Sequence, residues 1–190
     1  GEKRGSQAQI VGLEDSDVSV FYQEDAEIKA VRVAESGEFI AIGYGKEADD
    51  HNVVVMDKFG NEINTFNFDR EITGLNLYGS GSTLTVFSEN RVAVFEVLSG
   101  KRIASSSFRN GTLRFANYSG ADQSIVGLTG DLNGNTLSNI EVRIINVAAK
   151  KIISETYSGE VEVADFDAIT LNRKGRFNYT ISGMSKDLSL

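Results

Sequence analysis

The sequence predicts an all-β protein made of repeated four-stranded antiparallel units. Short apolar runs alternate with polar breaks rich in Gly, Asn, Asp and Ser, and the 190 residues include 19 glycines but no proline. Runs of this length, bounded by turn residues, are typical of strands rather than helices. The same order of runs and breaks recurs along the chain, which indicates a repeat architecture.

The first unit begins with VRVAESGEFIAIGYG, residues 31–45. ESGE separates two apolar runs and offers a glycine for a turn position with positive φ. A strand that exposes one face alternates apolar and polar residues, whereas FIAI is apolar throughout, so we expect both of its faces to be covered. NVVVMDKFGNEINTF then adds a third and a fourth strand around a turn at residues 58–61.

Two further copies and a partial one follow. Residues 71–108 contain four strands with turns at GSGS, SEN and LSG, and residues 111–157 contain four more. Residues 161–183 supply two strands of a fourth copy, and MSKDLSL is left as a tail. The glycines of the first hairpins, at 37, 81, 120 and 175, recur at intervals of 44, 39 and 55 residues, the longest of which includes an extra loop, GDLNGNTLSN. A period of about 40–45 residues with four strands per copy predicts β-propeller blades.

Two hairpins resemble known propeller repeats. ESGEFIAIGYG resembles the WD40-type hairpin, in which a glycine turn precedes a strand ending in small residues. VFEVLSGKRIASSSF resembles the PQQ-like pattern of a strand, a turn of the TG type and a strand ending in a bulky ring. The chain is therefore similar to the WD40 and PQQ-like β-propeller repeat families over nearly its whole length. It has no Gly-His pair, no Trp-Asp pair and no tryptophan, so no functional residue is carried over.

The termini suggest how the ring closes. AQIVGLEDSDVSVFYQ predicts a hairpin of two strands, and two strands from each terminus would complete a fourth blade without exposed edges. Residues 1–190 then form a single propeller domain of about four blades. Alternatives are a propeller segment within a larger ring, a homo-oligomer in which a second copy completes the ring, and another all-β layout such as a β-sandwich.

Composition disfavours several classes of partner. With 19 Lys and Arg against 27 Asp and Glu the net charge is −8, which disfavours nucleic acid and anionic membrane surfaces. No apolar run approaches the roughly 20 residues of a membrane span, so no membrane insertion is expected. Cysteine is absent, which excludes disulfides and thiolate sites but fits both a reducing cytosol and a bacterial envelope, so the compartment is open.

The extra loop of the third copy is the candidate metal site. Asp131, Asn133 and Asn135 fall at alternate positions, as do the first oxygen ligands of calcium-binding loops. Thr136 and Val142 stand where such a loop has Gly and Glu. A hairpin tip with high turn propensity is the favoured interpretation, so no cofactor is expected, and calcium is the alternative.

Other polar groups are weaker candidates. KEADDHN offers metal ligands but more readily forms a solvated turn, since one histidine without a spaced second is a poor metal signal. Three glycosylation acceptor patterns are explained by chance in a chain rich in Asn, Ser and Thr. The residues concerned are Glu47, Asp49, Asp50 and His51 in the first case, and Asn110, Asn117 and Asn178 in the second.

The sequence contains few candidate catalytic residues and no known catalytic motif. The sequence has no GxSxG, phosphate loop or dinucleotide fingerprint, and Asp165 and Asp167 fit charged neighbours on a blade edge. We therefore expect a non-catalytic propeller that serves as a binding or assembly module for a protein or glycan partner. The alternative is a propeller enzyme with an acidic or metal-containing axial site.

Overall fold

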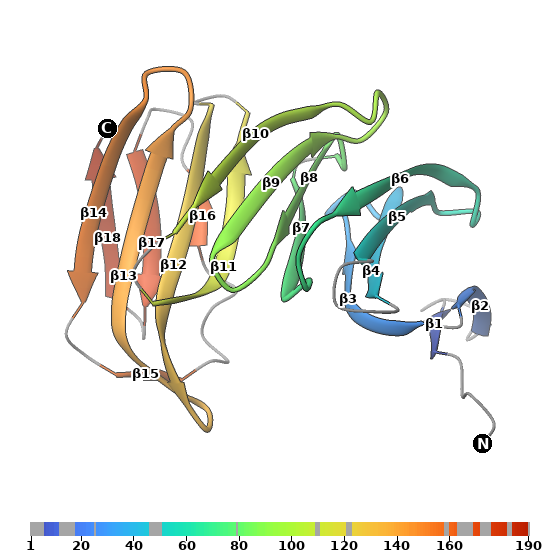
Figure 1. The fold of residues 1–190 in the computed structure, drawn as a ribbon, viewed down its shortest axis with the longest axis horizontal. Coiled ribbons are helices and arrows are strands. Elements are labelled where there is room, and N and C mark those ends of the chain that lie inside the picture. Colours follow the sequence, from blue (N-terminus) through green and yellow to red (C-terminus); the bar gives the residue numbers. More distant parts are fainter. Residues whose placement is uncertain are drawn as a thin grey trace. The chain divides into compact units, whose positions relative to one another are not determined.

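A computed structural model of the chain shows only β-strands and turns in the parts that it describes, which confirms the all-β prediction (Figure 1). No helix in these parts is long and apolar enough to span a membrane. The described backbone comprises residues 6–11, 18–24, 26–45, 51–78, 80–108, 111–120, 123–157, 160–162, 169–171, 176–181 and 184–189, with side chains described mainly between residues 26 and 156.

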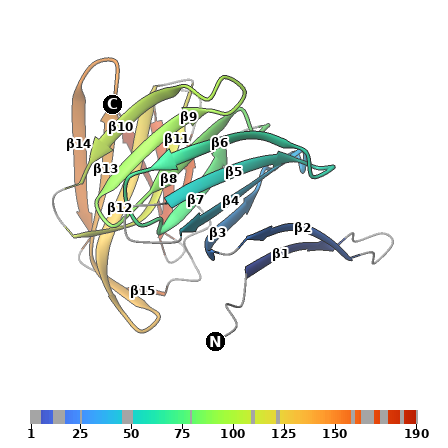
Figure 2. The same cartoon turned by 45° about the vertical axis from the view of Figure 1, so that its right-hand side comes forward.

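The first predicted unit is a four-stranded antiparallel sheet in chain order (Figure 2). Gly37, in its first turn, has a φ of 71°, the left-handed value predicted for that position. Val33 pairs with Ile40 across this hairpin, and Phe39 pairs with Asp57 across the next one. The strands are β3 (Glu27–Val33), β4 (Phe39–Gly45), β5 (His51–Asp57) and β6 (Glu62–Phe68).

The second and third predicted copies also have their four strands in chain order, and a short fifth strand joins the third sheet. The second sheet has β7 (Gly74–Tyr78), β8 (Thr83–Phe87), β9 (Arg91–Glu96) and β10 (Arg102–Ser107). The third has β11 (Thr112–Ser119), β12 (Ser124–Asn133), β13 (Thr136–Asn146) and β14 (Lys151–Tyr157). We call these three sheets the first, second and third blades.

The terminal segments correct two predictions. β15 (Val161–Glu162) pairs with β13 of the third blade instead of starting a fourth copy, and the expected tail forms a strand, β18. The C-terminal sheet thus has three strands while the predicted N-terminal hairpin has two, so the two-plus-two strand count is wrong. Closure of the ring stays a prediction. The remaining strands are β1 (Ser6–Val11), β2 (Val18–Glu24), β16 (Ile169–Leu171), β17 (Arg176–Ile181) and β18 (Met184–Ser189).

The chain divides into two compact units, and the boundary falls within the second blade. The first unit comprises residues 1–88 and 93–103, and the second comprises residues 89–92 and 104–190. The prediction of a single domain stays a prediction.

Both faces of β4 and β5 are covered in the first unit, as their unbroken apolar runs predicted. Ala41 and Val53 belong to a buried cluster on one face, whereas Ile42 and Val54 belong to a second cluster on the other. All four side chains are at most 2% exposed. The alternation of clusters along each strand follows from the two-residue period of a strand.

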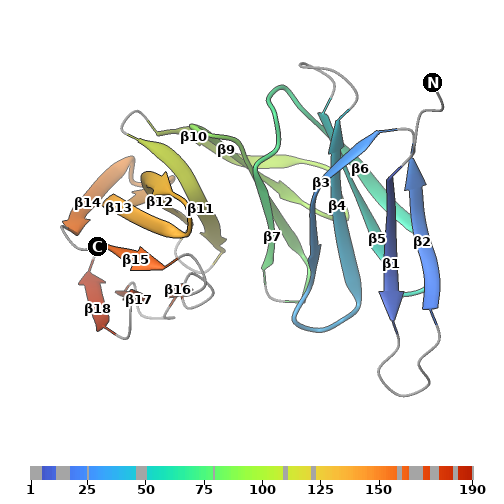
Figure 3. The same ribbon diagram turned by 90° about the horizontal axis from the view of Figure 1, so that it is seen from below.

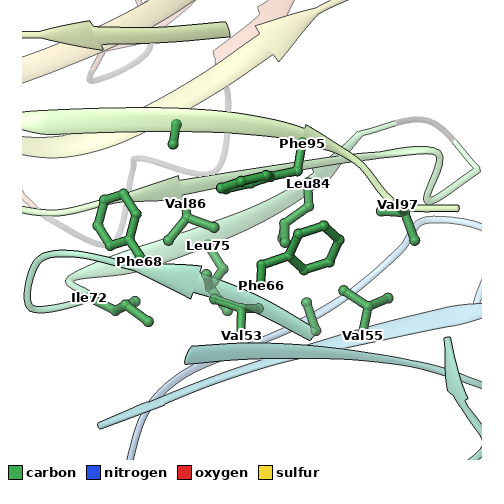
Figure 4. Close-up of a cluster of buried hydrophobic side chains, with 12 residues drawn as sticks. Val53, Val55, Phe66, Phe68, Ile72, Leu75, Leu84, Val86, Phe95 and Val97 are labelled. Carbon is green, nitrogen blue, oxygen red and sulfur yellow. The ribbon is translucent and has the colours of Figure 1, made fainter. Parts of the chain in front are cut away.

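The larger cluster packs the first blade against strands of the second (Figure 4). The rings of Phe66 and Phe95 are tilted by 47° and their centroids lie 4.9 Å apart. Beside this core, β7 lies next to β3 (Figure 3), and the Nε of Arg32 donates a hydrogen bond to the carbonyl oxygen of Leu75 at 3.1 Å. The cluster comprises Ala41, Val53, Val55, Phe66, Phe68, Ile72, Leu75, Leu84, Val86, Ala93, Phe95 and Val97.

One core position of the second unit has room only for a glycine, because an aromatic ring occupies the space that a side chain would take. Phe108 is 2% exposed, and its ring lies so close to Gly127 that a Cβ on the glycine would be 2.2 Å from its Cζ. Arg143, which pairs with Gly127 across β12 and β13, holds its guanidinium 5.8 Å from the ring centroid. Glu141 accepts a hydrogen bond from this guanidinium at 2.8 Å.

The stretch expected to be an extra loop in the third blade is instead a strand extension. β12 and β13 stay paired to their tip, where Asn133 faces Thr136 across a two-residue turn (Figure 1). Gly134 occupies the first central position with a φ of 61°, as in a type II′ hairpin turn. We call residues 130–139 the hairpin arm. β15 pairs with Thr136 and Leu137 of β13, so a third strand lies beside the end of the hairpin arm.

Candidate binding surface

The last residue of the third strand begins an equivalent turn in each complete blade. The residue that follows it donates a backbone hydrogen bond of 2.9 Å to the first turn of the same blade, from Lys58 to Glu38, from Val97 to Ser82 and from Val147 to Gln123. The preceding residue is Asp57, Glu96 or Asn146, and its side chain caps the turn. This common geometry makes the three turns directly comparable.

In the first blade the cap is a carboxylate with several donors. Asp57 Oδ1 accepts hydrogen bonds from the backbone N–H groups of Phe59 and Asn61, both at 2.9 Å. Its Oδ2 accepts a third from the Asn61 amide at 2.8 Å. The Asn61 side chain, and to a lesser degree the turn amides, hold the pKa of Asp57 below its usual value because they stabilise the ionised form.

In the second blade the cap is Glu96, whose Oε2 accepts a hydrogen bond from the Ser99 hydroxyl. The Ser99 Oγ in turn accepts one from the backbone N–H of Lys101 at 3.3 Å. In the third blade Asn146 Oδ1 accepts a hydrogen bond from the backbone N–H of Ala149 at 2.6 Å. Each turn is therefore held by its own side chain.

The residue two positions after the cap points a large apolar side chain into solvent in two of the blades. Phe59 is 77% exposed and Leu98 is 74% exposed, whereas the third blade has Ala148 at this position. Single exposed apolar residues are common, but here two of them occupy the same position in the corresponding turns of two blades.

The turns of the first unit are linked across the first and second blades. The Ser36 hydroxyl donates to the Ser80 carbonyl oxygen at 3.3 Å, and the Asn64 amide donates to the Val97 carbonyl oxygen at 3.2 Å. Gly81, with a φ of 92°, lets the neighbouring turn approach the Phe39 ring more closely than any side chain would allow. We call residues 34–38, 57–62, 80–82 and 96–101 the turn surface.

Charge on the turn surface is uneven. The first-blade part of the turn surface has four carboxylates and one ammonium group, that of Lys58. The Lys58 Nζ lies 2.8 Å from Glu38 Oε1 and 5.3 Å from the centroid of the Phe59 ring. Near Leu98 in the sequence there is one carboxylate, that of Glu96, and there are two basic residues, Lys101 and Arg102. The four carboxylates of the first blade are Glu35, Glu38, Asp57 and Glu62.

The structure places the three predicted calcium ligands on the hairpin arm, all exposed. Asp131 and Asn133 point to one face of β12 because they are two residues apart, and Asn135 lies in the turn. Asp131 Oδ2 accepts a hydrogen bond from the Asn139 amide at 2.9 Å. No three His, Cys, Asp or Glu residues gather as a metal site within the described ranges. Calcium binding stays a prediction.

The weaker candidates are dispersed. His51 begins β5, is 4% exposed and lies against Gly45, its partner in the ladder. Asn117 is half-buried in β11, and its Oδ1 accepts a hydrogen bond from the backbone N–H of Tyr118 at 2.8 Å. Asn178 lies in β17. Glu47, Asp49, Asp50, Asn110, Asp165 and Asp167 lie outside the described residues.

Sequence reasoning missed Phe59 and Leu98, although a signal was present. MDKFGN and FEVLSGK share an acidic residue at the end of an apolar run and a large apolar residue two positions later, inside the turn. Apolar residues within a polar turn are unexpected from turn propensity alone. Aligning the copies on the acidic residue would have identified both positions.

Comparisons with known proteins bear on the fold. No protein-family model matches the chain, and no curated protein sequence matches it. Solved structures do match it. Kuenenia stuttgartiensis hydrazine synthase is 18% identical with a TM-score of 0.58, over 80% of this chain and 43% of the other. The Cps50 (Swd1) β-propeller domain of Myceliophteria thermophila is 17% identical with a TM-score of 0.57, over 83% and 55%. The RRP9 WD40 repeats are 11% identical with a TM-score of 0.58, over 97% and 56%.

These similarities define the class of protein. The four-stranded blades are those of the β-propeller fold, and they are similar to the blades of WD40 repeat domains. The chain spans about half the length of these three matched chains. The PQQ-like part of the resemblance stays a prediction.

Proposed function

We propose that the chain is a non-catalytic β-propeller module that binds a protein partner through the turn surface. The single observation that carries this proposal is the pair of exposed apolar side chains, Phe59 and Leu98, at the same position of adjacent turns. Exposed large apolar side chains that bind nothing favour aggregation, whereas at an interface they contribute binding energy when a partner buries them.

The rigidity of the two turns supports the same proposal. The cap by Asp57 and the bond from Asn64 to Val97 fix the backbone under both apolar side chains. A preordered surface loses less conformational entropy when a partner binds. The solved WD40 propeller domains that the chain resembles lend further support as a structural analogy.

Site-specific photo-crosslinking in cells that express the protein tests the proposal. A photoreactive phenylalanine analogue replaces Phe59, Leu98 or, as a matched control, Ile152, which is 61% exposed on β14. We expect positions 59 and 98 to crosslink to the same protein and position 152 to give no such adduct. Absence of adducts at 59 and 98, or identical adducts at all three positions, would overturn the proposal.

A further inference from the structure

Beyond a protein partner in general, we infer that the turn surface accepts a partner segment in which apolar side chains are flanked by Lys or Arg, with the basic residue beside Phe59. This inference rests on the proposed function. It depends on a second feature of the surface, the distribution of charge around the apolar side chains, and it names the chemistry of the partner.

The first-blade part of the surface has a surplus of negative charge. Of its carboxylates, Glu38 is paired with Lys58, the ammonium group of these two turns. Asp57 is kept ionised by hydrogen bonds that lower its pKa. Glu35 and Glu62 are exposed and add two more negative charges. A basic partner segment therefore gains favourable electrostatic interaction here, and an acidic one is repelled.

The Phe59 ring offers a specific place for the basic group. Lys58 lies over the ring at 5.3 Å, which shows that a cation is accommodated at an aromatic face. With 77% of the residue exposed, a partner cation has access to the ring as well. An arginine is favoured over a lysine, because its planar guanidinium both stacks on a ring and forms paired hydrogen bonds with carboxylates.

The surroundings of Leu98 differ from those of Phe59 in side-chain type and in charge. Leu98 is aliphatic and is followed by Lys101 and Arg102, so it favours an apolar partner residue without an adjacent cation. The two positions together predict a polarity for the bound segment, with its basic end at Phe59 and its uncharged apolar end at Leu98. The Asn64 bond to Val97 keeps the two positions in one arrangement.

Selection from a random dodecapeptide phage library on the intact chain tests the inference. We expect enriched peptides to combine apolar residues with Lys or Arg, and to bind about tenfold more weakly to Phe59→Ser and Leu98→Ser than to the parent or to Ile152→Ser. The affinity of these peptides should fall as the salt concentration rises from about 0.05 M to about 0.5 M. Glu35→Gln and Glu62→Gln should each weaken binding at low salt, whereas Glu89→Gln, outside the surface, should not.

The outcomes separate the two proposals. Enriched peptides that are acidic, or whose binding ignores salt and the two Gln variants, would overturn the inferred chemistry while crosslinks from positions 59 and 98 still support a binding surface. Failure to enrich any peptide that depends on Phe59 would also overturn the inferred chemistry. Failure of both the crosslinks and the selection would overturn the proposed function itself.

Discussion

The carboxylate of Asp57 accepts a hydrogen bond from the backbone N–H of Phe59 at 2.9 Å, so the most exposed aromatic residue of the described chain is held by an ionised side chain. The pKa of Asp57 is lowered from 3.8 in the folded protein, chiefly by Asn61. A carboxylate with a lowered pKa stabilises the fold above its unfolded pKa, and this stabilisation is lost as the pH falls through the folded value.

Asp57→Asn should therefore lower the free energy of unfolding at neutral pH, and the difference from the parent should shrink as the pH falls below about 3.8. Urea unfolding of both proteins across this range provides the measurement. In an Asn61→Ala background the difference at neutral pH should be smaller, because the main donor is gone. A difference that is constant with pH would show that the charge of Asp57 does not stabilise the turn.

Buried and exposed leucines of the second blade should differ sharply. Leu84 is fully buried in the larger cluster, and Leu84→Ala should lower the free energy of unfolding by about 2–5 kcal/mol, because it removes apolar contacts and leaves a cavity. Leu98→Ala should change it by no more than about 0.5 kcal/mol, because Leu98 is 74% exposed. Chemical denaturation compares them, and equal effects would contradict the packing of the first unit.

The third blade depends on a glycine under an aromatic ring. Gly127→Ala should cost about 1–3 kcal/mol, because the new Cβ would lie 2.2 Å from Phe108 Cζ and the ring is held in a full core. Gly120→Ala is the matched control, since its nearest neighbour, Tyr118 Cε1, is 4.0 Å away. Thermal unfolding of both variants is the measurement. A melting temperature unchanged by Gly127→Ala would mean that Phe108 does not occupy this position.

Calcium binding at the hairpin arm is predicted to be weak. Asp131 is the only carboxylate among the three candidate ligands, and it already accepts a hydrogen bond from Asn139. We expect a small rise in melting temperature at millimolar calcium that a chelator reverses and that Asp131→Ala abolishes. A melting temperature independent of calcium would leave these residues with a role in the hairpin turn alone.

The repeat could be predicted from the sequence because a strand buried on both faces has an unbroken run of apolar residues. FIAI and VVVM lack polar alternation, and the structure covers both faces of β4 and β5. Positive φ at Gly37 and Gly81 follows from the same turn signals. These features are local, since each depends on a few consecutive residues and on the geometry of a strand or turn.

The errors concern features decided by distant pairing. The Asn- and Gly-rich stretch from Asp131 to Asn139 has the composition of a loop, but Leu132 and Leu137 pair in the ladder and β15 adds a strand at the tip. Likewise, the tail beginning at Met184 becomes a strand because β17 offers it a free edge. Phe59 and Leu98 were missed because their exposure depends on how the caps shape the turns.

Hydrogen exchange of the backbone amides, measured with and without the partner that crosslinking identifies, tests the binding surface most directly. If the turn surface is the interface, backbone amides of residues 57–61 and 96–101 should exchange more slowly in the complex, while those of the hairpin arm around residues 133–136 keep their free rates. Protection confined to the arm, or to any segment other than the two turns, would contradict the account.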